Sequence, residues 1–515
     1  MPVTSQLDPR NAIPPPPSSL ASELKALVKH TSVYGAGNLL NKLAGFLLIP
    51  FYTHYLTPAD YGTLELLDLS VALLGLAVLM WMNSSIVRYY YDYEDRRSRN
   101  EVISTALLIA FAVGTLCGTA GMLFAKQLST LILKSPGYYR YFQLLSVTFF
   151  FSTLSSVSFS FLRAKQRSGL VTIVNVATLI LSLCLNIYFI AIVHTGVIGI
   201  LYSGLISTAL AAVALTVVTV REVRLHFSPE KLKALATYGA PLVFTSFSAF
   251  ALNFSDRFFL QHYTNVSTVG IYALGYKFGF MLSFLVVQPF DMIWSSRLYE
   301  VAKKQDGERL FSRIFRYYGL VLVSVALGLS LIIKDVISIV AAASFLDAYK
   351  VVPVVALAYV FQGAYRFMVG GIYLQKKTYR VGMISAVSLA ANILLNFTLI
   401  PIYGAMGAAW ATAISFLFMA GMAYVVSERL YTVGYQLGAF FVPVAVATGL
   451  YLIAAKISVA SLALSAALKI LLLACFPVAL LLVGFFRKDE IRKAIETGQS
   501  LWTSYGWRST AVSER

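Results

Sequence analysis

The sequence predicts an all-α integral membrane protein with about 14 transmembrane helices, arranged as two parallel six-helix lobes plus two extra C-terminal helices. Three observations predict this fold. Hydrophobic residues make up 58% of the 515-residue chain and charged residues 12%, whereas a typical soluble domain carries about 25% charge. Apolar runs of about 22 residues recur, and each is long enough to cross about 30 Å of hydrocarbon as a helix. A set of repeated motifs divides the chain into two related halves.

The spanning elements are predicted to be helices because runs such as 106–124 and 437–455 are apolar on every face. Strands of a membrane barrel would be about 10 residues long and would alternate in polarity. The apolar segments lie at about residues 31–53, 62–87, 102–125, 141–162, 170–193, 196–220, 237–260, 270–296, 317–333, 351–374, 381–402, 405–427, 437–455 and 463–486.

These segments predict a division of the chain into six units. The units are a cytoplasmic leader with a short amphipathic helix (1–30), an N-lobe (31–220), a cytoplasmic linker (221–236), a C-lobe (237–428), two further spans (437–486) and a cytoplasmic tail (487–515).

The distribution of basic residues predicts the orientation. Most of the 41 Lys and Arg fall in one alternate set of loops: loop 297–316 contains many of them, and loop 261–269 contains none. Because cytoplasmic loops carry the excess of Lys and Arg, both termini are predicted to be cytoplasmic.

Three motif pairs, in the same order in each half, indicate the repeat. Each half holds six segments, and an even number makes the two repeats parallel. In the first pair, Tyr34-Gly35-Ala36 corresponds to Tyr238-Gly239-Ala240. In the second, His54-Tyr55 followed by Gly62 corresponds to His262-Tyr263 followed by Gly270. In the third, Asn186 followed by Gly196–Gly199 corresponds to Asn396 followed by Gly404–Gly407.

Several of these stretches also resemble a known family. Tyr34–Asn38, Leu56–Gly62, Val269–Lys277 and Gly404–Ala409 are similar to the polysaccharide-biosynthesis branch of the multidrug/oligosaccharidyl-lipid/polysaccharide exporter superfamily. The resemblance implies a flippase that moves a polyprenyl-diphosphate-linked oligosaccharide across the bacterial cytoplasmic (inner) membrane for O-antigen, capsule or exopolysaccharide assembly. It implies coupling to H⁺, Na⁺ or the membrane potential, contact with membrane lipids, and glycan polymerase or ligase partners.

Three alternatives stay open. A cation-coupled multidrug exporter of the same superfamily would have a carboxylate-rich cavity. A lipid II flippase would resemble the chain in its fourteen spans but would carry an Ala-Asp-Arg signature where this sequence has Tyr272–Lys277. An enzyme acting on lipid-linked glycans would need catalytic residues in a sizeable outer loop, and the longest outer loops, 126–140 and 334–350, contain no histidine. We therefore expect no enzyme activity.

The composition also excludes other classes. The net charge of +18 does not come from a basic cluster on one soluble face, so no nucleic acid is expected. The three cysteines and five histidines lack the spacing of metal ligands or disulfides, so neither a metal nor a cofactor is expected.

Ionisable residues inside the spans are the candidate site residues, because each costs about 2.5 to 3.5 kcal/mol at the bilayer centre unless it faces a cavity or a partner. Lys42 and Arg366 are the cations furthest from the ends of their spans. With Lys277, they are expected to bind the diphosphate, although an ion pair inside one lobe remains an alternative for each. Asp291 follows Pro289 near the inner end of its span and is a further candidate for coupling.

A gate is expected between Asp68 and Lys277, which lie at matched depths when Gly62 is superposed on Gly270. Glu65 shares the helix face of Asp68 and offers a second acceptor. Asp256 and Arg257 are further gate or coupling candidates. They and Glu65 lie within about one helical turn of the predicted outer surface, where an interfacial charge needs no functional cause.

Overall fold

The computed structural model describes residues 45–457 and 462–486, and these residues are helical with short connections. The predicted leader helix, Lys42 and the C-terminal tail lie outside them. In the first half, residues 45–55 are helical, and the later elements are α2 (Pro58–Gly75), the π-helical turn η2 (Leu76–Met80), α3 (Trp81–Asp92), α4 (Arg96–Leu123), α5 (Ala125–Leu133), η3 (Pro136–Tyr138), α6 (Tyr139–Ala164), α7 (Ser168–Ile187), η4 (Tyr188–Ile192) and α8 (Val197–Val223).

Two helices, α9 (Pro229–Phe254) and α10 (Asp256–Tyr263), lead into the second half. Its elements are α11 (Val266–Leu282), the π-helical turn η5 (Ser283–Val287), α12 (Gln288–Ala302), α13 (Gly307–Val340), η6 (Ala343–Lys350), α14 (Val352–Leu374) and α15 (Tyr379–Leu430), followed by α16 (Leu437–Lys456) and α17 (Leu462–Leu482). Of the two predicted lobes, the N-lobe contains α2–α8, and the C-lobe contains most of α9 together with α10–α15.

Side-chain caps fix where several of these helices begin. The Thr57 hydroxyl accepts from the amide of Asp60, whose carboxylate accepts from the amide of Thr57, and Pro58 fills the first helical position of α2. Asn265 caps α11 in a related way by accepting from the amide of Thr268. The two helices that become central to the site therefore both start at locally encoded positions.

Eleven helices of the described residues are long and apolar enough to cross a membrane, so the chain is a multi-pass membrane protein. Fourteen spans were predicted, and the difference lies in three places. The predicted span 31–53 is described only from residue 45, and 237–260 runs across α9 and α10. The 52-residue α15 covers two predicted spans; at about 78 Å it exceeds twice the hydrocarbon thickness, and it breaks at Gly404. The count of fourteen stays a prediction.

The predicted repeat is visible in the backbone. Gly196 and Gly404 adopt the same positive-φ conformation, with φ/ψ of 63°/−139° and 53°/−128°. Few residues other than glycine adopt this conformation. The number of residues that separates Gly196 from Gly404 also separates Gly62 from Gly270. The π-helical turns η2 and η5 are separated by the same number to within one residue. The two halves therefore share local backbone geometry as well as sequence motifs.

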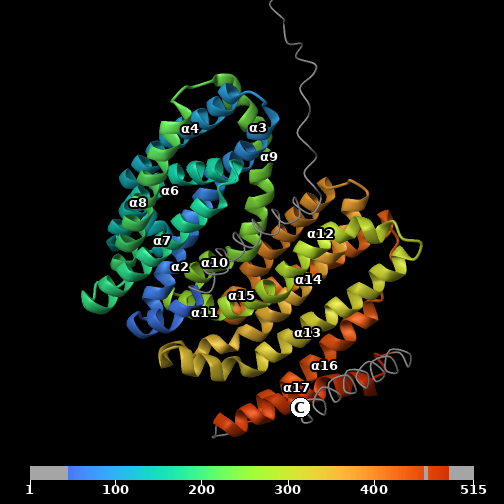
Figure 1. The fold of residues 1–515 in the computed structure, drawn as a ribbon. Helices are drawn as coiled ribbons and strands as arrows, with labels where there is room; N and C mark the ends of the chain where they lie inside the picture. The colour runs from blue at the N-terminus through green and yellow to red at the C-terminus, as the bar shows by residue number, and fades with distance from the viewer. Residues whose placement is uncertain (1–44, 458–461, 487–515) are drawn as a thin grey trace, which may run out of the picture.

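The lobes meet at the ends of α2 and α11 and diverge towards the opposite end, where α9 runs beside α3 (Figure 1). At the meeting point the two backbones approach closely. A Cβ added to Gly62 would lie 2.0 Å from the carbonyl oxygen of Val266, and one added to Gly270 would lie 2.0 Å from that of Pro58. The motif glycines of the two repeats therefore form the contact between the lobes.

The last two helices, α16 and α17, pack on α13 at the side of the C-lobe away from the N-lobe (Figure 1). An ion pair strengthens this contact, because Lys469 Nζ of α17 lies 2.6 Å from Asp335 Oδ2 of α13. The pair explains why an apolar helix carries a lysine.

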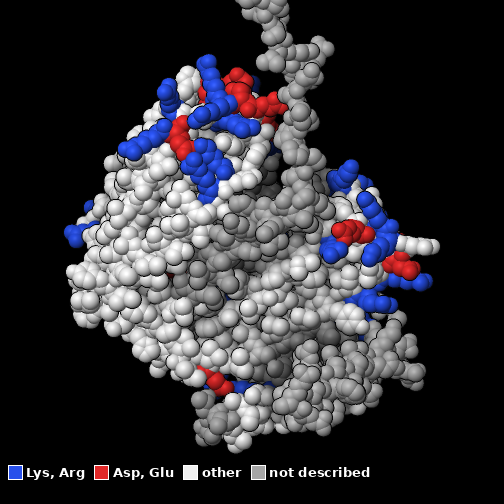
Figure 2. Space-filling model, viewed as in Figure 1, with Lys and Arg blue, Asp and Glu red and all other residues white. Residues whose placement is uncertain are grey.

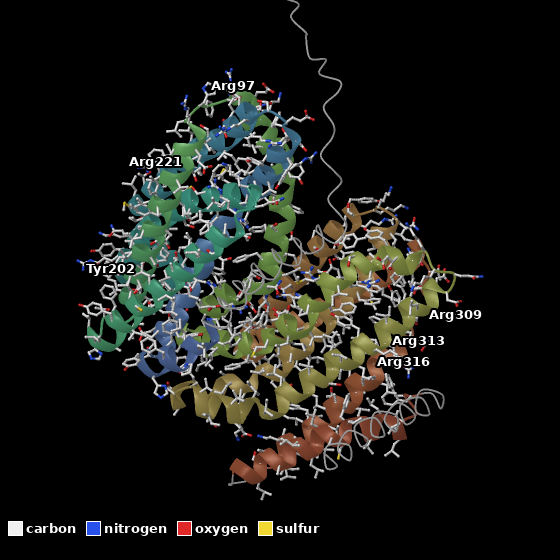
Figure 3. All side chains as sticks on the ribbon, in the orientation of Figure 1. Arg97, Tyr202, Arg221, Arg309, Arg313 and Arg316 are labelled. Carbon is white, nitrogen blue, oxygen red and sulfur yellow. The ribbon has the colours of Figure 1, made fainter. Side chains whose placement is uncertain are left out.

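The surface seen in Figure 2 is mostly uncharged, and Lys and Arg gather on it mainly at two places, one on each lobe. Figure 3 places Arg97 and Arg221 at the N-lobe end and Arg309 and Arg313 at the C-lobe end. Both are at the end where the lobes diverge. The broad uncharged surface that extends from them towards the other end of the molecule is the area that hydrocarbon can cover.

Candidate functional site

A cluster of charged residues lies where the two lobes meet. Glu65 comes from α2, Asp256 and Arg257 from the first turn of α10, and Lys277 from α11. We call these four residues the ion cluster. Their formal charges cancel, which makes burial of the cluster possible inside a membrane protein.

Arg257 is the most buried member, with only 1% of the residue exposed. Its NH1 atom donates to Asp256 Oδ1 at 2.6 Å and to the carbonyl oxygen of Asn253 at 2.8 Å. Its Nε lies 3.8 Å from Glu65 Oε1, and its guanidinium carbon lies 3.8 Å from the ring centroid of Tyr276. The guanidinium therefore joins the N-lobe carboxylate Glu65 to groups of the C-lobe side.

Lys277 completes the cluster from α11. Its Nζ lies 3.3 Å from Glu65 Oε2 and donates to the Tyr61 hydroxyl at 3.0 Å. Glu65 is thus shared by two cations, each using a different carboxylate oxygen. The Lys277 side chain is 44% exposed, so the cluster runs from a fully buried guanidinium to an ammonium that faces open space.

The expected pair of Lys277 with Asp68 is not formed in this structure. Lys277 pairs with Glu65 instead, and within the described residues Asp68 has no cation within ion-pair distance. Asp68 is exposed although Leu67 and Leu69 on either side of it are buried. Its carboxylate therefore faces an open space beside the cluster.

Asp256 and Arg257, which are predicted to be gate or coupling residues, do not lie at an exposed interface, and their role stays a prediction. Both residues are buried between helices and bonded to each other. An end-of-span position gives depth along the membrane normal, but it does not tell whether a side chain faces lipid or protein. The protein interior holds these two charges.

Tyrosines and an amide extend the cluster into the C-lobe. The Tyr272 hydroxyl donates to Asp256 Oδ2. The hydroxyl of Tyr359 on α14 lies 2.8 Å from that of Tyr276 and donates to Asn253 Oδ1 at 3.1 Å. Sequence reasoning missed these residues. Asn253 inside an apolar run was an available signal, because a buried amide needs partners.

A second pair of charges lies in the C-lobe nearer the diverging end. Arg366 NH1 of α14 lies 3.6 Å from Asp291 Oδ2 of α12. The Arg366 side chain is 55% exposed, while its neighbours along the helix, Tyr365 and Phe367, are buried. The guanidinium therefore faces open space and keeps unused donors beyond its one carboxylate contact.

The structure thus brings four of the predicted residues into one cluster and pairs two others with each other. Asp68 lies on the same helix as Glu65 but outside the ion pairs, and Lys42 lies outside the described residues. This arrangement provides exposed cations in a largely apolar interior, together with carboxylates that compensate them. Such a site can bind an anionic group and can exchange ion-pair partners.

Comparison with known proteins gives the family. A sequence profile described as "Polysaccharide biosynthesis protein" matches residues 53–350. The chain belongs to this family. It is 24% identical over 269 residues to an uncharacterized membrane protein of Haemophilus influenzae, a match that covers 51% of this chain and 63% of that protein. The chain therefore spans somewhat less than two thirds of this curated relative.

Solved structures show the same fold at low sequence identity. The lipid II flippase MurJ in an inward closed conformation matches with a TM-score of 0.70 at 12% identity, covering 87% of this chain and 98% of that one. An inward-facing multidrug resistance MATE family transporter of the MOP superfamily matches with a TM-score of 0.61 at 15% identity, covering 76% and 95%. The expected exporter-superfamily fold is confirmed.

Proposed function

We propose that this protein is an alternating-access flippase that moves a polyprenyl-diphosphate-linked oligosaccharide across the bacterial cytoplasmic membrane for cell-surface polysaccharide assembly. The observation that carries the proposal is the exposed guanidinium of Arg366 in an otherwise buried stretch of α14. A diphosphate carries two or more negative charges that must stay paired on leaving water. Membership of the polysaccharide biosynthesis family supports the same substrate class.

The ligand would enter between the lobes from the diverging end. Arg366 would bind the diphosphate there and in doing so would loosen its own contact with Asp291, and Lys42 is proposed to contribute a second cation. The lipid chain would remain in the bilayer while the glycan crosses. No covalent step is required, so the protein acts as a transporter and not as an enzyme.

The ion cluster would act as the gate at the opposite end. In the present structure Glu65 binds Lys277 and Arg257 across the lobe contact. Opening that end would separate these charges, and Asp68, three residues along the same helix, could then accept Lys277. Two energy sources could drive this cycle. H⁺ or Na⁺ could bind the carboxylate that is released, or the membrane potential could act on the cations.

The predicted orientation places the diverging, basic end in the cytoplasm, together with both termini of the fourteen-span chain. Under this orientation the lobe contact at Gly62 and Gly270 closes the outer side. Glycan polymerases or ligases would then receive the product there.

The test measures transport of a polyprenyl-diphosphate oligosaccharide in proteoliposomes. An impermeant glycosidase added outside cleaves only the glycan that has reached the outer leaflet, so the rate of cleavage reports transport. Arg366→Ala should reduce the transport rate about 10- to 150-fold, because a hydrogen bond to a charged group contributes about 1.5 to 3 kcal/mol. Arg366→Lys should retain part of the rate, and Lys42→Ala should resemble Arg366→Ala.

Arg297→Ala is the matched control, since Arg297 lies on α12 near the lobe end and pairs with Glu300 at the surface. Normal transport by Arg366→Ala, with the protein inserted at the usual level, would contradict the proposal.

Extrusion of amphipathic cations in place of the glycolipid would instead identify a multidrug exporter. The exposed carboxylate of Asp68 favours this alternative.

A further inference from the structure

A cavity of about 480 Å³ lies at the N-lobe side of the lobe contact, within the size range of about 300 to 1,000 Å³ typical of ligand sites. Helices α2, α4, α5 and α6 form its walls, and α10 closes it from the other side. The lining is apolar except at one end. Ser70, Leu74, Gly121, Leu131, Lys134 and Gln261 are the lining residues that decide what the cavity can hold.

The repeat shows why this space is empty. By the offset that relates Gly62 to Gly270, Ser70 corresponds to Phe278 and Gly121 corresponds to Leu329. In the C-lobe, Phe278 is buried and packs against Phe46, and Leu329 packs into the same cluster. The N-lobe has only a hydroxymethyl group in place of the Phe278 ring, whereas the space beside Gly121 is filled by Ser146, whose Oγ would lie 2.2 Å from an added Cβ. The cavity is therefore a specific difference between the repeats.

The cavity has an apolar mouth on the lipid-facing surface. Leu131 of α5 lines it and is 79% exposed, and Leu74 of α2 is exposed as well. Leu74 belongs to a helix that is long and apolar enough to cross a membrane, and α5 follows directly after another such helix, α4. A hydrocarbon chain can therefore enter from the bilayer without crossing polar surface.

One polar group inside the cavity lacks a partner. Gln261 is only 6% exposed, and its Oε1 accepts no hydrogen bond from the described residues. A buried amide oxygen without a donor costs about 1 to 3 kcal/mol. At the equivalent place in the other repeat, Thr53 is satisfied, since its hydroxyl donates to the carbonyl oxygen of Ile49. The Gln261 side chain therefore makes this end of the cavity polar, although its Oε1 atom is enclosed by protein.

The segment that contributes Lys134 to this end of the cavity carries unbalanced positive charge. Residues 126–140 contain Lys126, Lys134 and Arg140 and no carboxylate. Lys134 lines the cavity and donates to the carbonyl oxygen of His262. The equivalent segment of the other repeat, 334–348, contains one cation, Lys334, and two carboxylates, Asp335 and Asp347, and Asp347 pairs at 2.8 Å with Lys350 just beyond it. Only the N-lobe segment is left without a compensating acid.

We propose that this cavity binds one acyl chain of an anionic glycerophospholipid from the leaflet at the α2/α11 end. The chain occupies the space that the small Ser70 side chain leaves open, and the phosphate lies at Lys134. Because α10 closes the cavity against α2, the bound lipid contacts both sides of the lobe seam. This site is separate from the glycolipid path and does not depend on the proposed transport activity.

The probe is phosphatidylglycerol with a photoreactive diazirine in one acyl chain, used with the full-length protein in nanodiscs. After irradiation, crosslinked peptides are mapped by mass spectrometry. Crosslinks are expected on α2, α4 and α6 at the cavity wall. Ile173, exposed on α7, gives the background labelling of the lipid-facing surface.

Ser70→Phe introduces the residue of the other repeat and should reduce wall crosslinking to the background level, whereas Ser70→Ala keeps the space and should leave it unchanged. Lys134→Gln should weaken retention of the probe about fivefold, since one surface lysine contributes about that factor with anionic lipid. Lys350→Gln is the matched control on the other repeat. The phosphatidylcholine version of the probe should also be retained less well.

Three results would overturn the proposal. The first is equal wall crosslinking in Ser70→Phe and Ser70→Ala. The second is equal retention of the phosphatidylglycerol probe by the unmodified protein and by Lys134→Gln. This comparison tests the proposal even if Ser70→Phe fails to fold. The third is displacement of the probe by a polyprenyl phosphate at a lower concentration than by unlabelled phosphatidylglycerol, which would make the carrier lipid the occupant.

Discussion

The close contact at Gly62 allows the lobe seam to be opened by a single methyl group. The Cβ of Gly62→Ala would lie 2.0 Å from the carbonyl oxygen of Val266, and ordinary contact begins at 3.4 Å. The obstacle is backbone, so no side chain can rotate away. Helices α2 and α11 must therefore separate by about 1.4 Å at this point, and forced overpacking of this kind typically costs about 1 to 3 kcal/mol.

This cost falls only on the state in which the lobes touch at this end. The equilibrium between that state and one with the seam open should therefore move about 5- to 150-fold towards the open seam. Because the lobes diverge at the other end, opening the seam should bring the basic ends closer together. Gly75→Ala is the matched control on the same helix, since its nearest neighbour would lie 4.0 Å away.

The assay is double electron–electron resonance between spin labels at Arg97 and Arg309, which mark the basic ends of the two lobes (Figure 3). The native cysteines Cys117, Cys184 and Cys475 are first replaced. Gly62→Ala should add or enlarge a short-distance population that the Gly75→Ala protein lacks. Identical distance distributions in the two variants, both folded, would refute the reasoning.

Two further predictions concern the ion cluster and the orientation. Glu65→Gln should lower the free energy of unfolding by about 3 kcal/mol, measured by thermal denaturation in detergent, because it leaves buried Arg257 with one carboxylate fewer; unchanged stability would contradict the described pairing. Cysteines placed at Asn265 and Gln305 should react with an impermeant thiol reagent in intact cells only at Asn265, and labelling at Gln305 alone would invert the proposed topology.

The sequence was sufficient for the membrane class, the helical content and the repeat. Those properties depend on local composition and on glycines whose backbone conformation or close approach tolerates no side chain, as at Gly196, Gly404 and Gly62. The motif spacing also led to residues that the fold brings together, because α2 and α11 do meet at their matched starts.

The partner of Lys277 could not be predicted in the same way. Glu65 and Asp68 lie three residues apart, about 4.5 Å along the helix axis, and both share roughly one face of α2. Which carboxylate reaches Lys277 depends on the crossing angle and the rotation of the two helices. Matched depth favoured Asp68, whereas the packed helices direct Glu65 to both cations. Tertiary geometry decided between two locally equivalent residues.

The π-helical turns η2 and η5 lie at equivalent places in the two repeats, just beyond the helices that make the lobe contact. A π-turn holds one more residue than an α-turn, so the side chains beyond it are rotated by roughly 100° relative to an unbroken helix. Its hydrogen-bond ladder is also interrupted, and helices bend most easily at such interruptions. The halves of α2–α3 and α11–α12 on either side of these turns can therefore tilt separately. A lobe built in this way need not swing as one rigid piece: its seam half can stay closed while its basic half moves.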